Sequence, residues 1–179
     1  MKPVAIRPDP IMKKRVTIYW LVPAKPESEL FRDIIRILAK EFNGPLFQPH
    51  LTLCRSEDRS SPRTVLSQVR VLSVQLRIRE IAHSAKFTKT LFVRFAPSRR
   101  LQLVVTELGG KTRSVSDPHL SLLYKKSPAA IRRELAATIN LPMAEVRFDA
   151  ITAMRCVLPT KTKQDVETWR KLATKRLSG

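Results

Sequence analysis

One pentapeptide occurs twice in this chain with a single conservative difference. Residues 49–53 read Pro-His-Leu-Thr-Leu and residues 118–122 read Pro-His-Leu-Ser-Leu, and the two copies contain two of the chain's three histidines. Side chains alternate between the two faces of a β-strand, so residues two apart share a face. The repeat therefore predicts two strands, each with leucines turned to a core and a histidine beside a hydroxyl on the opposite face.

Two such pairs suit the hydrolysis of a phosphodiester, provided that both copies meet at one site. The candidate catalytic residues are His50, Thr52, His119 and Ser121. One imidazole can remove a proton from water while the other protonates the leaving oxygen, because histidine titrates near neutral pH. The hydroxyls can donate hydrogen bonds to the phosphoryl oxygens. A lone His-x-Thr is more often structural, but two nearly identical copies favour a shared site.

Hydrophobic periodicity, together with proline and glycine breakers, predicts a mixed fold. Strands are expected at 15–22, 50–54, 74–83, 90–95, 119–124 and 145–158, and helices at 27–42, 62–72, 98–108 and 127–139. The run at 166–172 fits a strand or a helix equally well. Strands that come in hairpin-like groups, as well as alternating with helices, indicate an α+β fold with antiparallel sheets. The chain of 179 residues is expected to form one domain.

The charge of the chain is strongly unbalanced. It has 34 Lys and Arg against 15 Asp and Glu, a net charge of +19 at pH 7. Such a field attracts polyanions, which favours a nucleotide or nucleic acid as partner, although a basic surface by itself specifies no substrate. No apolar run reaches the roughly 20 residues of a membrane-spanning helix. Residues 1–14 lack a secretory signal and are expected to form a flexible basic tail.

The two cysteines, Cys54 and Cys156, show no CxxC or Cys/His spacing typical of a metal site, and we expect free thiols. A disulfide between them stays open at this point.

The paired motifs resemble the signatures of the two-histidine phosphoesterase superfamily, and most closely those of its cyclic nucleotide phosphodiesterases of the plant and yeast type. The resemblance rests on the early strand YWLVP, on PHLTL, on PHLSLLY with its trailing tyrosine, and on the late segment VETW. It extends from residue 17 to about residue 172.

The resemblance implies a bilobal fold with two pseudo-symmetric lobes, in which two antiparallel sheets line a central cleft and helices lie outside. It implies hydrolysis of nucleoside 2′,3′-cyclic phosphates or ADP-ribose 1″,2″-cyclic phosphate without a metal or other cofactor. His50 would be the acid and His119 the base, although these labels can be exchanged, and Thr52 and Ser121 would bind phosphate. A monomeric cytoplasmic protein of RNA processing, such as tRNA splicing, would fit this branch.

Two further aromatic residues, Tyr124 and Phe87, each have two possible roles. Tyr124 follows the second motif and would border the cleft or pack in the core; Phe87 would stack on a nucleobase or pack in the core. Trp20 and Trp169 are expected in the core, and the third histidine, His83, is expected to be structural or on the surface.

Two other functions remain open. The chain could act on a 2′,3′-cyclic or 2′–5′-linked RNA end, which the net charge favours, or it could be a non-catalytic RNA-binding module.

Overall fold

The computed structural model describes residues 12–56 and 60–179. Of the tail expected at residues 1–14, residues 1–11 lie outside this described part. Lys13 forms an ion pair with Asp165, with 2.5 Å between Nζ and Oδ1, and Lys14 already begins the first strand.

Within the described residues, seven strands are combined with five α-helices and two short 3₁₀ helices. The strands are β1 (Lys14–Pro23), β2 (Leu51–Arg55), β3 (Val74–His83), β4 (Leu91–Phe95), β5 (His119–Leu123), β6 (Glu145–Leu158) and β7 (Arg170–Arg176). The helices are α1 (Glu27–Phe42), α2 (Pro62–Gln68), α3 (Arg99–Glu107), α4 (Ala129–Thr138), α5 (Lys163–Glu167), η1 (Phe87–Lys89) and η2 (Thr112–Val115). Each element that the sequence predicts is present, with ends shifted by a few residues.

The undecided run at 166–172 contains the end of a helix and the start of a strand. α5 ends at Glu167 and β7 begins at Arg170. A capping box starts α5: the Thr162 hydroxyl accepts from the backbone N–H of Asp165, and the Asp165 carboxylate accepts from the backbone N–H of Thr162. A helix of five residues is too short to show helical periodicity, which explains why the pattern fitted both structures.

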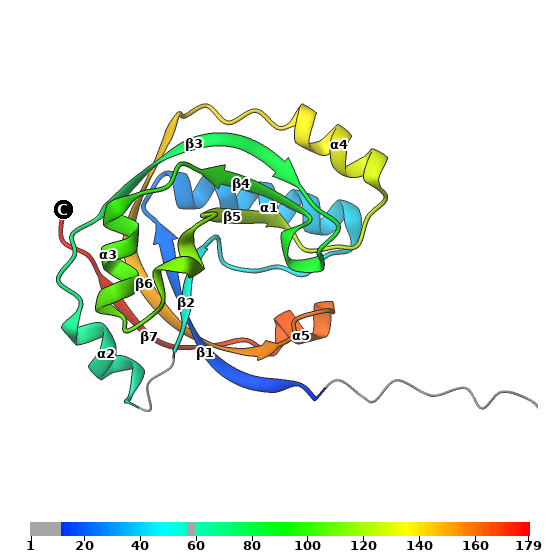
Figure 1. The fold of residues 1–179 in the computed structure, drawn as a ribbon. Coiled ribbons are helices and arrows are strands. Elements are labelled where there is room, and N and C mark those ends of the chain that lie inside the picture. Colours follow the sequence, from blue (N-terminus) through cyan, green and yellow to red (C-terminus); the bar gives the residue numbers. More distant parts are fainter. Residues whose placement is uncertain (1–11, 57–59) are drawn as a thin grey trace, which may run out of the picture.

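The strands form one antiparallel sheet in the order β1-β2-β5-β4-β3-β6-β7, and β1 also pairs with β6. The predicted α+β class with antiparallel strands is confirmed. In place of two separate sheets, the structure has two halves of a single one: β3, β4 and β5 form one half, and β1, β2, β6 and β7 form the other (Figure 1).

The length of β6 explains why the halves are joined. Its 14 residues pair first with β3, at residues 145–148, and further along with β7, at residues 150–155. At the opposite join, Leu51 of β2 pairs with Leu120 of β5. This second join lies within the two repeated motifs.

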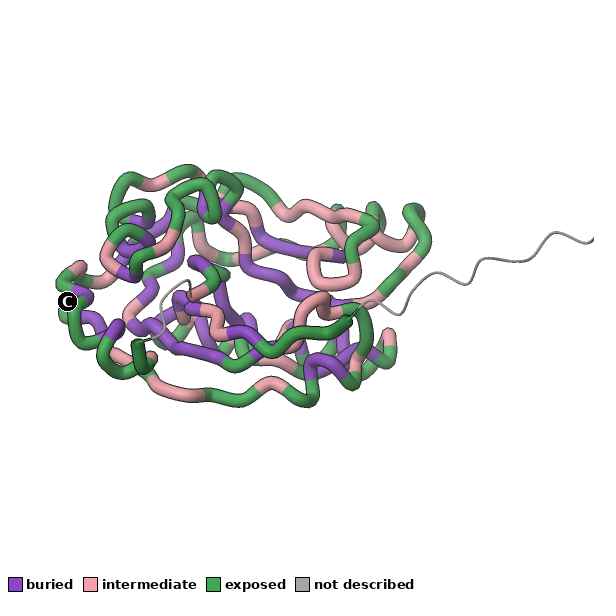
Figure 2. Tube along the Cα trace, turned by 60° about the horizontal axis from the view of Figure 1, so that its bottom comes forward, coloured by how far each residue is buried: buried purple, intermediate pink, exposed green. Residues whose placement is uncertain are grey.

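Helices cover the outer faces of the sheet. α1 and α4 contact the half that holds β3, β4 and β5, whereas α2 and α3 contact β7 and β2 of the other half (Figure 1). Buried segments run through the interior of the molecule, and exposed segments lie mainly at its periphery (Figure 2). Along β1, Tyr19 and Leu21 face the main core, while Trp20 faces the opposite side and packs with Met154 and Cys156.

No disulfide joins the two cysteines, and both are buried. Cys54 belongs to the main core and Cys156 to the small cluster around Trp20. Among the helices of the described residues, none has the length and apolar character needed to cross a membrane.

Candidate active site

The two repeated motifs lie side by side at the join between the halves of the sheet. His50 immediately precedes β2, and His119 is the first residue of β5. Because Leu51 and Leu120 are antiparallel partners, the two copies run in opposite directions past one another. Positions that are far apart in the sequence therefore meet, as the hydrolytic hypothesis requires.

Both motifs contribute to a hollow of about 300 Å³, which we call the histidine hollow. It is lined by His50, Thr52, Lys86, Thr88, Lys89, His119, Ser121 and Tyr124. In each motif the leucines are fully buried on the other face: Leu51, Leu53, Leu120 and Leu122 are all 0% exposed. The alternation predicted from the sequence thus places the histidines and hydroxyls together, outside the core.

Each histidine is oriented by a backbone carbonyl two residues before it. Nδ1 of His50 lies 2.6 Å from the carbonyl oxygen of Gln48, and Nδ1 of His119 lies 2.9 Å from that of Asp117. A carbonyl oxygen can only accept, so Nδ1 carries the proton and Nε2 is left with a lone pair. Both histidines therefore have the same tautomer, with Nε2 available for proton transfer.

The proline in each motif contributes to this arrangement. Pro49 and Pro118 separate the accepting carbonyl from its histidine and are both buried. Proline fixes its own φ and restricts the preceding residue to extended conformations. The repeated unit is therefore the carbonyl, the proline and the histidine together, and the motif includes proline for a structural reason.

His50 is enclosed by aromatic rings. Only 5% of its surface is exposed, and it stacks on Trp20 with 3.6 Å between ring centroids and 10° between planes. Trp169 and Phe47 approach the imidazole edge-on. Burial lowers the pKa of His50 to about 4, against an opposing effect of the Gln48 carbonyl, and the neighbouring charge of His119 lowers it further.

His119 lies in a more polar environment. Burial lowers its pKa, and the Asp117 carbonyl opposes this; Lys89 and Arg94 lower the pKa, whereas the Asp117 carboxylate raises it. That carboxylate binds Lys89 at 2.6 Å and Arg94 at 2.9 Å, so the cations beside the imidazole are partly neutralised. His119 can therefore hold a proton more readily than His50.

The two hydroxyls of the motifs differ. Ser121 is buried, and its Oγ donates a 2.9 Å hydrogen bond to the carbonyl of Thr88. Thr52 is exposed, and within the described part of the chain its Oγ1 has no hydrogen-bond partner. The Thr52 hydroxyl is therefore free to donate to a ligand, whereas Ser121 would first have to turn its proton away from Thr88.

Tyr124 and Phe87 differ in whether they line the histidine hollow. Tyr124 lines the histidine hollow, is 4% exposed and stacks on Phe47 with 3.9 Å between centroids. Burial raises its pKa, which a hydrogen bond with Ser121 opposes, so it stays a neutral phenol. The ring of Phe87 is 6.1 Å from that of Tyr124, but Phe87 does not line the hollow. The structure thus places Tyr124 in the lining of the hollow and Phe87 outside that lining.

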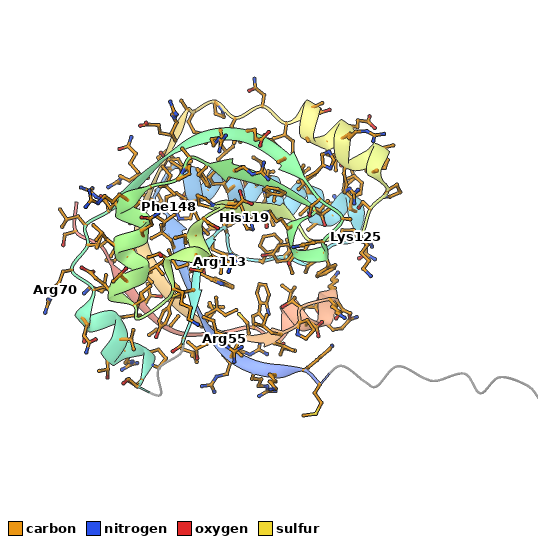
Figure 3. The ribbon with its side chains drawn as sticks, in the orientation of Figure 1. Arg55, Arg70, Arg113, His119, Lys125 and Phe148 are labelled. Carbon is orange, nitrogen blue, oxygen red and sulfur yellow. The ribbon has the colours of Figure 1, made fainter. Side chains whose placement is uncertain are left out.

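A second hollow of about 470 Å³ adjoins the first and shares His50, Thr52, Thr88 and Tyr124 with it. We call it the aromatic hollow, because Trp20, Tyr124 and Trp169 line it. Arg55 at the end of β2 also lines it, in the half of the sheet opposite to His119 (Figure 3).

Trp20 and Trp169, expected in the core, thus form part of the candidate site. The alternation along β1 carried the relevant signal for Trp20, since both of its neighbours face the main core. In the described part of the chain, no three His, Cys, Asp or Glu side chains gather in a way that could hold a metal ion.

Comparisons with known proteins identify the fold. Scans of the sequence against protein-family models and against curated proteins found no match. Among solved structures, E. coli LigT complexed with ATP matches with a TM-score of 0.56 and 16% identity, over 92% of this chain and 98% of LigT. LigT complexed with 3′-AMP gives 0.54 and 18%, over 92% and 99%. A phosphoesterase gives 0.55 and 16%, over 93% of this chain and 100% of its own. The chain shares the fold of these proteins over nearly its whole length.

Proposed function

We propose that this chain, which has the two-histidine phosphoesterase fold of E. coli LigT, is itself a two-histidine phosphodiesterase that opens cyclic phosphates without a metal ion. The observation that carries the proposal is the convergence of His50 and His119 on one hollow. In each, Nδ1 is bound to a carbonyl, and Nε2 has no hydrogen-bond partner among the described residues. A pair of histidines held in this way can supply both the base and the acid of a phosphodiester hydrolysis.

The reaction needs one proton on the pair. The base takes a proton from water, whose oxygen attacks phosphorus; the bond from phosphorus to one ribose oxygen breaks, and the acid protonates that oxygen. Burial lowers the pKa of His50 to about 4, whereas at His119 the Asp117 carboxylate opposes the lowering of the pKa. We therefore assign the proton to His119. His119 is then the acid and His50 the base, the opposite of the labels that the family resemblance implies.

Groups around the histidines suit an anionic phosphate. The free hydroxyl of Thr52 can donate to a phosphoryl oxygen, and Lys86 and Lys89 bring positive charge to the same hollow. The aromatic hollow beside it offers Trp20 and Trp169 to a nucleobase or ribose. Crystals of LigT with phosphate, 3′-AMP, ATP and NADP⁺ support nucleotides as ligands on this fold. We therefore propose nucleoside 2′,3′-cyclic phosphates, or ADP-ribose 1″,2″-cyclic phosphate, as substrates.

The direct test is turnover by the purified protein. We expect each cyclic substrate to be converted to a monophosphate, which chromatography resolves, at the same rate with and without excess EDTA. The proposed activity would be contradicted if the protein converted none of the three substrates: the two small cyclic phosphates and an oligonucleotide ending in a 2′,3′-cyclic phosphate. Loss of turnover in EDTA that returns with added divalent metal would contradict the metal-free mechanism alone.

The pH dependence should reflect the two lowered pKa values. We expect kcat/KM for a cyclic mononucleotide to be bell-shaped, with its maximum below pH 6.5. Above the pKa of His119 the acid loses its proton, and below about pH 4 His50 gains one and can no longer act as base. The kcat profile should lie at higher pH, because a bound anion raises the pKa of a neighbouring imidazole. A kcat/KM that keeps rising from pH 6.5 to 8 would exclude this assignment of the proton.

A further inference from the structure

A third hollow, of about 470 Å³, lies next to the candidate active site but belongs to neither hollow described above. Gln48 and Pro49 line it, and the next residue, His50, lines the histidine hollow. On the sheet, Thr152 lines it and is the register partner of Trp20, on which His50 stacks. The third hollow therefore borders the candidate active site at two places, along the chain at Pro49 and His50 and across the sheet at Trp20 and Thr152.

Positive charge dominates this hollow, which we call the basic hollow. Its charged lining consists of five cationic side chains, Lys25, Arg32, Arg147, Lys171 and Arg176, and a single carboxylate, Asp149. The cations come from the segment before α1, from α1 itself, from β6 and from β7, so they converge from separate elements.

Part of this charge is not held in an ion pair in the described part of the chain. Asp149 binds Arg176 at 3.0 Å, and Lys25 pairs with Glu29 at 2.8 Å. Within the described residues no ion pair involves Arg32, Arg147 or Lys171. Cations that converge on a concave surface focus their field and attract anions, and arginine matches the geometry of phosphate oxygens. The basic hollow therefore has the chemistry of a phosphate-binding site.

We propose that the basic hollow binds the phosphate backbone of a single-stranded RNA whose cyclic end lies in the histidine hollow. This inference rests on the proposed function and deepens it by naming a longer substrate. A cyclic mononucleotide can be accommodated by the histidine and aromatic hollows alone, so it gives no role to three further unpaired cations. Phosphate contacts of this kind position a strand without reading its sequence, which suits an enzyme that acts on ends.

A variant that removes the unpaired charge tests this site. Arg32, Arg147 and Lys171 are all exposed, so the triple variant R32Q/R147Q/K171Q removes three charges without opening the core. The matched control is K40Q/R99Q/R133Q, which removes three cations that are likewise exposed but do not line the basic hollow. Both variants have the same net charge, so a difference between them reports position and not overall field.

Two substrates are compared for each protein: a 2′,3′-cyclic mononucleotide and a single-stranded RNA 12-mer ending in a 2′,3′-cyclic phosphate. We call R32Q/R147Q/K171Q the hollow variant. We expect it to lower kcat/KM for the 12-mer by at least about tenfold at low salt, and to change kcat/KM for the mononucleotide by less than about twofold. The slope of log kcat/KM for the 12-mer against log salt should become shallower by about 2, since each lost contact to a single strand removes roughly 0.7. The control should change the 12-mer much less.

Binding of a 12-mer with a 3′-phosphate, measured by fluorescence anisotropy, separates failure of this inference from failure of the proposed function. If neither substrate is turned over, the proposed function fails, and weaker 12-mer binding by the hollow variant alone would still support the site. Equal binding by the two variants would overturn the inference. So would an equal loss of kcat/KM on the mononucleotide and on the 12-mer.

Discussion

Replacement of His119 by alanine is expected to lower kcat for a cyclic phosphate by about 10²- to 10⁴-fold, the usual contribution of a positioned general acid or base. The same loss is expected for His50→Ala. Both side chains line one hollow, and in the described part of the chain no other histidine lines it. The measurement is kcat at saturating cyclic mononucleotide, with circular dichroism to verify folding.

The third histidine provides the control. His83 lies at the end of β3 and does not line any of the three hollows, so His83→Ala should change kcat by less than about twofold. His119 gives the cleaner test, because it is partly exposed, whereas removal of His50 also removes the ring that stacks on Trp20. Unchanged turnover in His119→Ala would contradict the role of His119 as general acid. A wild-type protein that binds RNA but converts none of the cyclic substrates would be better described as a binding module than as an enzyme.

Much of the site could be predicted because its determinants lie within single strands. The alternation in each pentapeptide fixes which face carries the histidine and which carries the leucines, and all four leucines are indeed fully buried. The duplication of the motif indicated that the two copies act together. Their antiparallel pairing through Leu51 and Leu120 gives that indication a structural basis.

Other features depend on contacts between distant elements, which local patterns do not encode. The join of both halves into one sheet follows from β6 pairing with β3 and then β7. The position of Trp20 under His50 depends on how β1 and β2 pair, with a register shift between Tyr19 and Trp20. The cations of the basic hollow come from the segment before α1, from α1, from β6 and from β7, and in the sequence each of them resembles an ordinary solvated cation.

The proline of the motif was visible in the sequence, but its role was not. Only the structure shows that the carbonyl before each proline accepts from Nδ1 of the histidine after it. The two motifs thus agree in side chains and also in the way that the backbone selects the tautomer. The two imidazoles are thus held through the same atom, Nδ1, although their surroundings differ: His50 stacks on Trp20, whereas charged side chains surround His119.

The hydroxyls of the two motifs, in contrast, should contribute unequally. We expect Thr52→Val to lower kcat by about 10²- to 10³-fold, the typical cost of losing one hydrogen-bond donor to a developing charge. Thr52 is exposed, and valine has nearly the same shape, so the folded structure should be retained. Thr52→Ser keeps the hydroxyl and should recover most of the activity.

Ser121→Ala should cost far less, about tenfold or below, since the Ser121 proton is already engaged with the Thr88 carbonyl at 2.9 Å. The comparison requires kcat for Thr52→Val and Ser121→Ala on the same cyclic mononucleotide, with KM measured alongside to separate binding from catalysis. A Ser121→Ala loss equal to or greater than that of Thr52→Val would mean that Ser121 turns its proton to the phosphate when substrate binds. In that case the unliganded hydrogen bond to Thr88 would be a resting contact, and the two motifs would act as functional equals.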